Sequence, residues 1–283
     1  MMKITFLGTA AATAMPLPFC DCMVCKMSRK LKGKNIRKRS SVAINNDLLI
    51  DLGPDSAIAC IEYDINLSKI KYILQTHVHS DHFDAGHLVT RHLDYASENI
   101  KSITLVSSPD TMKALNRKIQ NEDSKIDIFN EECQRELAVS LNIISHKEAI
   151  ILGDYKISAF ESLHDVSEQS LIYLIENKGK TILYGTDLLE ISEEVYSLLK
   201  GHFIDIMILD QTYGAGYNAG GHLDAEQVIE IINRMKEMNI INENSQIFAT
   251  HISHEGNSIH EVMEEVASQN FYNVAYDGCI IEI

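Results

Sequence analysis

Long apolar runs are missing from this sequence. No hydrophobic stretch approaches the roughly 20 residues that a membrane-spanning helix requires, although 45% of the 283 residues are hydrophobic. Residues 1–8 are too few, and too soon interrupted by polar side chains, to make a secretory signal peptide. These two absences argue against a protein that spans or contacts a membrane, and they lead us to expect a cytoplasmic location.

Basic residues are also scarce. The chain has 25 Lys and Arg against 40 Asp and Glu, which gives a formal net charge of −15. Such a surface repels a polyanion, so we do not expect nucleic acid as a partner. One local exception is the segment 29–39, which holds seven basic residues and no acid. It is either a solvated loop or a patch that attracts an anionic group.

Segments rich in proline, glycine or serine are missing as well, and no short repeat is visible. We therefore expect one domain over residues 1–283. The apolar patterns predict strands at 3–8, 41–44, 48–50, 70–74, 103–106, 139–144, 149–152, 155–160, 170–176, 180–184, 204–209, 246–249, 272–275 and 279–283. They predict helices at 54–63, 84–97, 109–120, 189–199, 224–238 and 258–268. Segments 9–40 and 121–136 show no periodicity and are expected to be surface loops.

This order of elements predicts the fold class. Strands begin each half of the chain and helices are interspersed throughout. Two sheets that pack face to face, with helices on both outer faces, satisfy this order. We expect an α/β protein with four αββα layers.

One stretch stands out against these absences. Residues 76–82 contain His77, His79, Asp81 and His82 directly after a buried apolar run. In an extended segment His77 and His79 point to the same side, and a following turn brings Asp81 and His82 toward the same place. Imidazole and carboxylate groups are ligands of zinc or manganese. We interpret the stretch as a metal-binding motif rather than a solvated histidine-rich loop.

Three further ligand candidates follow predicted strands. They are His164, Asp187 and His251, which come after strands 155–160, 180–184 and 246–249. Each alone is more often a structural polar group than a ligand. Their succession after the histidine motif is difficult to attribute to chance, and rigid strands can hold all of them.

This order of residues resembles the metallo-β-lactamase superfamily of binuclear metallohydrolases. The resemblance implies that one metal is held by His77, His79 and His164, and a second by Asp81, His82 and His251. It also implies that Asp187 bridges the two metals and that Asp51 supports the histidine loop. Two divalent metals, zinc or manganese, could activate a bridging hydroxide for attack on the substrate. Asp81 is therefore also a candidate catalytic residue.

The cysteines narrow the resemblance. Cys20, Cys22 and Cys25 offer three thiolates within six residues, and in a reducing compartment zinc is a better expectation than a disulfide. His254 could be the fourth ligand. This pattern resembles the PhnP-like group, the phosphoribosyl cyclic phosphate phosphodiesterases, and the related PqqB-like proteins, in which a Cys3His zinc is structural. We therefore expect a cysteine-containing zinc loop at about 9–40, and the alternative is a loop with three free cysteines.

His222 precedes the predicted helix at 224–238. In the PhnP-like group a histidine at this place is thought to protonate the leaving oxygen, which makes His222 a catalytic candidate. A helix N-terminus lowers the pKa of a histidine, which opposes that role at neutral pH. The alternative is a neighbour of the helix cap, with Asp224 as the capping residue.

We expect a metal-dependent phosphoric diester hydrolase that acts on a small cyclic or nucleotide-like diester. Arg37 and Arg39 are candidates to bind its phosphate, because guanidinium groups match phosphate oxygens. One alternative is a ribonuclease of the tRNA 3′-end-processing type, and another is a non-catalytic PqqB-like carrier protein. A homodimer is the default expectation for assembly.

Overall fold

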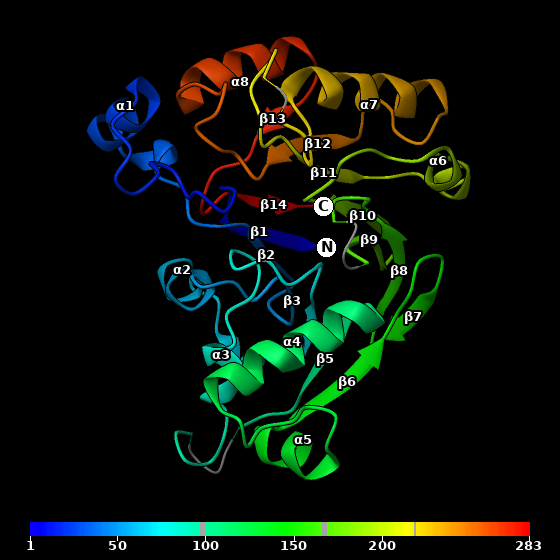
Figure 1. Cartoon of the computed structure of the whole chain (residues 1–283). Helices are drawn as coiled ribbons and strands as arrows, with labels where there is room; N and C mark the ends of the chain where they lie inside the picture. The colour runs from blue at the N-terminus through cyan, green and yellow to red at the C-terminus, as the bar shows by residue number, and fades with distance from the viewer. Residues whose placement is uncertain (97–99, 166–168, 218) are drawn as a thin grey trace.

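Two seven-stranded sheets form the centre of the molecule in the computed structural model, which describes residues 1–96, 100–165, 169–217 and 219–283 (Figure 1). The first sheet has, in spatial order, β14 (Ile280–Glu282), β1 (Lys3–Gly8), β2 (Ser41–Ile44), β3 (Leu48–Ile50), β4 (Tyr72–Leu74), β5 (Ile103–Ser107) and β6 (Val139–Ile143). The second has β13 (Asn273–Val274), β12 (Gln246–Thr250), β11 (Ile206–Asp210), β10 (Lys180–Gly185), β9 (Leu171–Asn177), β8 (Tyr155–Glu161) and β7 (Ala149–Leu152).

Helices cover the outer faces of both sheets. The described helices are α1 (Met23–Leu31), α2 (Ser56–Glu62), α3 (Gly86–Val89), α4 (Pro109–Glu122), α5 (Glu131–Leu137), α6 (Glu193–Leu199), α7 (Ala225–Glu237) and α8 (His260–Gln269), with short 3-10 helices at Gly33–Asn35 and Leu67–Lys69. In Figure 1, α7 and α8 lie beyond the second sheet, whereas α2, α3 and α4 lie on the side of the first sheet. Among the helices described, none has both the length and the apolar content needed to cross a membrane.

Three hydrophobic layers hold the described elements together, and β9 contributes side chains to two of them. Leu171, Tyr173 and Ile175 belong to the layer between the two sheets. Ile172 and Leu174, which alternate with them, belong to the layer that includes residues of α6, α7 and α8. Successive side chains of a strand point to opposite faces, so a strand that is buried on both faces reads as a continuous apolar run. The third layer packs α2, α3 and α4 on the first sheet. The αββα prediction is confirmed.

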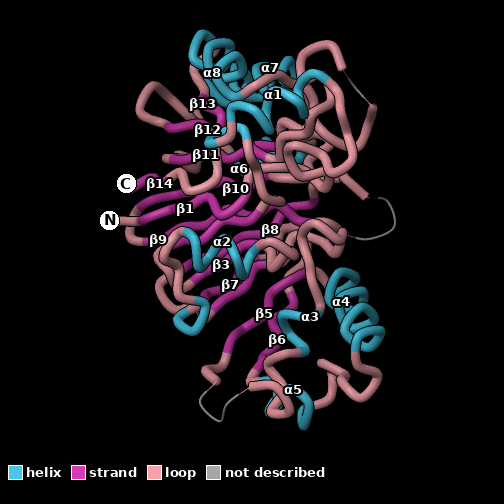
Figure 2. Tube along the Cα trace, turned by 90° about the vertical axis from the view of Figure 1, so that its left-hand side faces the viewer, coloured by secondary structure: helices cyan, strands magenta, loops and turns pink. Residues whose placement is uncertain are grey.

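Parallel pairing positions the ends of the strands. In the second sheet β10, β11, β12 and β13 are parallel to one another. β8 also runs in their direction, because β8 and β10 are each antiparallel to β9. In the first sheet β3, β4 and β5 are parallel. The carboxyl ends of parallel strands meet at one edge of a sheet, so residues that follow these strands gather there (Figure 2).

Most predicted elements are present within a few residues, but three segments differ. The segment 9–40 is not all loop, because it contains α1, whose N-terminus is capped by Cys22 and whose buried residues are only Cys25 and Ser28. These two buried positions hold a cysteine and a serine, so the buried face of α1 is not marked by large apolar residues in the sequence. The helix predicted at 84–97 is reduced to α3 and turns, and residue 97 lies outside the described residues. The segment 121–136 contains most of α5.

Candidate metal centre

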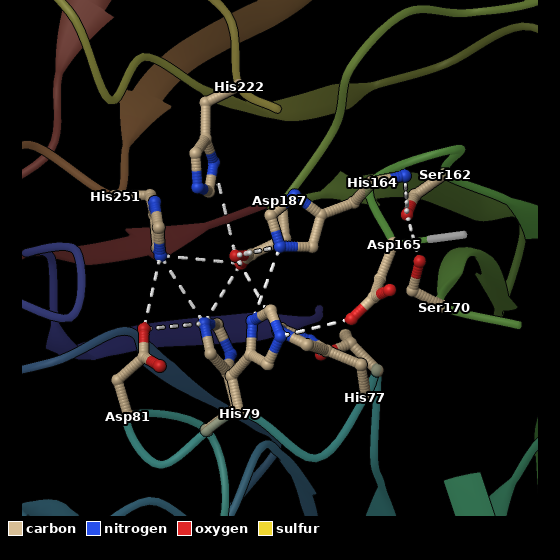
Figure 3. A network of polar contacts seen from close by, with 12 residues as sticks. His77, His79, Asp81, Ser162, His164, Asp165, Ser170, Asp187, His222 and His251 are labelled. Carbon is tan, nitrogen blue, oxygen red and sulfur yellow. Dashed lines mark hydrogen bonds and ion pairs between the residues drawn. The ribbon is translucent and has the colours of Figure 1, made fainter. Parts of the chain in front are cut away.

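The strand ends bring the predicted ligands together. The histidine motif follows β4, His164 follows β8, Asp187 follows β10 and His251 follows β12. Figure 3 shows these side chains pointing toward one another, with Asp187 in the middle. Asp187 and His251 have positive φ angles of 51° and 61°. The left-handed backbone is costly for a residue with a side chain, and such strain is concentrated at functional sites.

Four of these residues form what we call the outer cluster: His77, His79, His164 and Asp187. One nitrogen or oxygen atom of each lies within 4.8 Å of the others. Asp187 Oδ1 lies 3.6 Å from His77 Nε2 and 3.5 Å from His164 Nε2. His79 Nδ1 faces His164 Nε2 at 3.3 Å.

The inner cluster consists of Asp81, His82, Asp187 and His251, all of which are buried. Asp187 Oδ2 lies 2.9 Å from His82 Nε2 and 3.3 Å from His251 Nε2. Asp81 Oδ2 lies 3.1 Å from His82 Nε2. Asp187 therefore directs one carboxylate oxygen to each cluster, which is the geometry of a residue that bridges two metal ions.

The second ring nitrogen of every histidine in the two clusters has a partner. The contacts are His77 Nδ1 to Thr76 Oγ1 at 3.0 Å, His79 Nε2 to Asp165 Oδ2 at 3.2 Å, His82 Nδ1 to Asp51 Oδ2 at 2.7 Å, His164 Nδ1 to Gly221 O at 2.6 Å and His251 Nδ1 to Thr212 Oγ1 at 2.7 Å. Histidines that bind metals nearly always donate their other N–H in this way, because the bond fixes the ring and its tautomer.

The inner nitrogens of these rings are arranged to bind a cation. His77 Nε2 is buried without a hydrogen-bond partner among the described residues, and such an orphaned atom is costly unless something binds it. His82 Nε2 and His251 Nε2 face each other at 3.3 Å. If both rings donate their outer N–H, a cation between the two inner nitrogens removes the repulsion of their lone pairs. A metal ion would serve, and otherwise a proton on His82 does. Burial would lower the pKa of His82, but the carboxylates of Asp187 and Asp81 raise it well above its usual value. The two clusters fit a binuclear metal site.

Asp187 and His77 are in the deprotonated forms that bind a metal. Burial alone would raise the pKa of Asp187, but the surrounding histidines, His251 and His82 first, hold it well below its usual range. Burial lowers the pKa of His77 well below its usual value, so this imidazole is neutral. Metal ligands must be deprotonated, and both groups meet that condition at neutral pH.

Asp51 lies beneath the inner cluster and is fully buried. Its carboxylate accepts hydrogen bonds from the backbone N–H of Thr76 at 2.9 Å and from Gln75 Nε2 at 3.0 Å, in addition to the contact with His82. It therefore supports the histidine loop instead of facing the clusters, as the sequence led us to expect.

Asp210 is a site residue that our sequence reasoning missed. This buried carboxylate at the end of β11 lies 2.9 Å from His222 Nδ1 and accepts the hydroxyl of Thr212 at 2.8 Å. Thr212 in turn contacts the ring of His251. The available signal was an acid after the apolar residues of β11, the same pattern that singled out Asp187.

The environment of His222 differs from the prediction. Burial alone would lower its pKa, but the carboxylate of Asp210 opposes burial and raises the pKa to about 9. The expected effect of a helix N-terminus is thus outweighed by a direct ion pair. Asp224 caps α7, as the sequence predicted. His222 can carry a proton at neutral pH.

The cysteines and His254 form the cysteine cluster. The structure brings together Cys20, Cys22, Cys25 and His254, with one ligand atom of each within 4.8 Å of the others. Cys22 Sγ lies 3.4 Å from His254 Nδ1, and Cys20 Sγ lies 3.8 Å from the same atom. The structure therefore places His254 beside Cys20 and Cys22, which lie more than 230 positions before it, as the resemblance to the PhnP-like group implied.

Arg37 does not face the site, so the prediction that it recognises phosphate is wrong. Its guanidinium is fully buried, donates to Thr9 Oγ1 at 2.8 Å and contacts His260 Nδ1 at 3.0 Å. It also donates to the carbonyl oxygen of Ala275. Arg39 is paired with Asp55 at 3.0 Å. The run 29–39 is therefore partly a helix surface and partly a buried structural contact.

A cavity of about 140 Å³ opens beside the clusters. It is lined by Ala11, Ala12, Thr13, His79, Asp81, Asp187, Thr212, Tyr213, His222, His251, Ser253 and Glu255. Among the described residues, no lysine or arginine lines it. Pockets for drug-sized ligands usually measure about 300–1,000 Å³, so this cavity suits a small group.

Comparisons with known proteins agree with this geometry. The family described as beta-lactamase superfamily domain matches residues 46–252. No curated protein matches the sequence significantly. Among solved structures, a new diphosphatase from the PhnP family superposes with a TM-score of 0.74 at 23% identity, covering 100% of this chain and 97% of that one.

Two further structures share the fold. Zn²⁺-bound PqqB from Methylobacterium extorquens has a TM-score of 0.70 at 18% identity, with coverage of 99% and 100% of the two chains. The short form of human tRNase Z has a TM-score of 0.66 at 17% identity, with coverage of 99% of both chains. The family match and the two ligand clusters indicate a metal-dependent hydrolase, and the chain belongs to the beta-lactamase superfamily.

Proposed function

We propose that the protein is a metal-dependent phosphodiesterase that acts on a small diester. The observation that carries this proposal is the placement of Asp187, whose two oxygens face two complete ligand clusters. Two divalent metals held there would lower the pKa of a water and neutralise charge on the phosphoryl oxygens. The metals would be zinc or manganese, which His and Asp ligands both accept.

The chain itself supplies the proton for the leaving group. His222 lines the cavity and is held by Asp210 through its Nδ1 atom. Asp210 fixes the ring and favours its protonated form. A protonated imidazole at this position can donate its proton to the departing alkoxide. The Asp210 carboxylate then favours the uptake of a new proton by the ring.

The cavity supports a small substrate. It has room for little more than the groups around one phosphate, and its described lining offers no basic side chain to a second phosphate. An RNA substrate needs such contacts along its backbone. The site therefore favours a small diester over the tRNA-processing alternative. The complete set of ligands argues against a non-catalytic carrier.

We also propose that the cysteine cluster holds a structural zinc. Three sulfur atoms and one imidazole nitrogen would supply four protein ligands, and closed sets of this kind are typical of structural zinc sites. His254 lies three residues after His251, so a zinc there would fix the segment that carries an inner-cluster ligand. Its contribution would be to folding, with no part in the reaction.

The experiment is hydrolysis of bis(p-nitrophenyl) phosphate by the manganese-loaded protein. We expect turnover by the wild type and none by His79→Ala, with His202→Ala as a control at a histidine away from the clusters. Elemental analysis should find about three metals per chain, as expected for two catalytic ions and one structural zinc. Unchanged activity in His79→Ala would refute the assigned site. If the protein hydrolysed diphosphates and no phosphodiester, its substrate would be a phosphoric anhydride, and the phosphodiesterase proposal would be wrong.

A further inference from the structure

Two tyrosine rings and one carboxylate meet at the cavity. Tyr213 and Glu255 line it, and the Tyr217 hydroxyl donates a hydrogen bond to Glu255 Oε1 at 3.3 Å. The ring centroids of Tyr213 and Tyr217 are 5.3 Å apart, and the planes are tilted by 49°. We call these three residues the tyrosine–glutamate corner. Tilted rings beside a carboxylate are an arrangement that attracts an organic cation.

The backbone around this corner is closely fitted. Gly214 donates its N–H to the carbonyl oxygen of Glu255 at 3.1 Å. A Cβ atom at Gly214 would lie 1.8 Å from the carbonyl oxygen of Gly256, and one at Gly256 would lie 2.6 Å from Tyr217 Cβ. Only glycine permits both approaches. The loop that carries the tyrosines is therefore packed against the segment that carries Glu255.

Among the described residues, no lysine or arginine lines the cavity, and none forms an ion pair with Glu255, whose carboxylate accepts only the Tyr217 hydroxyl at the corner. The nearby Arg39, which contacts Ala12 at the cavity, is neutralised by Asp55. Burial and then the Glu255 carboxylate raise the pKa of Tyr213. The Glu255 carboxylate would repel an additional anionic group on a substrate and attract a cationic group.

The corner adjoins the residue that protonates the leaving group. The centroids of the Tyr213 and His222 rings are 6.0 Å apart. In Figure 3, His222 approaches Asp187 from the side opposite His79 and Asp81. A substrate whose phosphate lies at the clusters would therefore extend one ester group past His222 toward the corner.

We propose that Tyr213, Tyr217 and Glu255 form a subsite for an ammonium group on one ester arm of the substrate, which makes the substrate a zwitterionic phosphodiester. The proposal rests on the phosphodiesterase function for the other half of the substrate. Aromatic faces recognise quaternary and protonated ammonium groups, and a carboxylate adds direct charge pairing.

The direct test measures binding of choline to the metal-loaded protein by saturation-transfer NMR on its methyl protons. The matched probe is 3,3-dimethylbutanol, which has the shape of choline without its charge. We expect choline to bind at least about tenfold more tightly than the alcohol, and Glu255→Gln and Tyr217→Leu each to weaken it about tenfold. Tyr217→Phe keeps the ring and should retain most of the affinity. Equal binding of both probes, or full choline affinity in Glu255→Gln, would overturn the subsite.

A second measurement separates this proposal from the proposed function. The substrates are p-nitrophenyl phosphorylcholine and p-nitrophenyl 3,3-dimethylbutyl phosphate, compared by kcat/KM. We expect the wild type to prefer the choline ester by about tenfold and Glu255→Gln to lose that preference. Choline binding without hydrolysis of either ester would refute the phosphodiesterase and keep the subsite. Hydrolysis of both esters at equal rates would keep the phosphodiesterase and refute the subsite.

Discussion

The outer and inner clusters share Asp187 but differ in how closely the protein surrounds them. All four residues of the inner cluster are buried, whereas the side chain of His79 in the outer cluster is 45% exposed. His82 is held by the fully buried Asp51 at 2.7 Å, and His79 by the partly exposed Asp165 at 3.2 Å. Buried ligands with rigid partners are already arranged for metal, so the inner cluster should bind first and more tightly.

The same difference assigns different tasks to the two clusters. A metal in the inner cluster would be linked to the fold, because Asp51 also fixes the loop after β4. A metal in the outer cluster would lie nearer to solvent and would exchange contacts with substrate more readily. Four substitutions test this comparison.

The largest effect is expected for Asp187→Ala, which removes the shared ligand. Both catalytic metals should be lost and phosphodiester hydrolysis should fall by about a thousandfold or more, as expected when a central catalytic group is removed. Elemental analysis of the dialysed protein should still find one metal, in the cysteine cluster. Two catalytic metals retained after dialysis would show that the clusters do not depend on a common bridge.

Asp51→Asn should act on the inner cluster and on stability together. It leaves a buried network short of a charge, so the free energy of unfolding should fall by about 2–3 kcal/mol. Affinity for the first metal should fall by about 10–100-fold. Urea titrations and competition with a chelator measure the two effects. An equal loss of metal affinity at both clusters would contradict the proposed difference between them.

Cys22→Ser should affect the inner cluster more than the outer one, because His251 and His254 lie on one segment. The protein should lose one metal and unfold at a lower chelator concentration than the wild type. Hydrolysis at saturating manganese should fall only about tenfold, since no ligand of either cluster is removed. Cys133→Ser is the matched control, as Cys133 lies outside the cysteine cluster. Unaltered resistance to chelator would exclude the structural zinc.

The smallest effect is expected for Asp165→Ala. Loss of the contact with His79 should weaken the second metal about tenfold and change stability by less than about 0.5 kcal/mol. Asp165→Asn retains an acceptor and should recover most of the affinity. If instead the affinity for the first metal fell, the order of binding proposed for the clusters would be reversed.

Much of the fold and the ligand sets could be read from the sequence, because both depend on short patterns. The histidine motif, the apolar run of a strand and the acid or histidine that follows it each span only a few residues. That the clusters bind metal remains our proposal, but the structure does bring the predicted residues together.

What the sequence did not reveal depends on distant contacts. Asp210 is an ordinary strand-end acid until β11 places it beside His222. Arg37 looks like a solvated base until the fold buries it against Thr9 and His260. The tyrosine–glutamate corner joins residues about 40 positions apart through two glycines. Neither secondary-structure propensity nor the spacing of residues predicts such long-range contacts.

The most direct test of a binuclear centre is activity measured against added manganese. The starting material is protein that keeps the metal of its cysteine cluster and has been stripped of the others. We predict almost no hydrolysis of bis(p-nitrophenyl) phosphate during the first equivalent, which fills the inner cluster, and a rise to full activity during the second. Full activity after one equivalent would contradict the two-metal account.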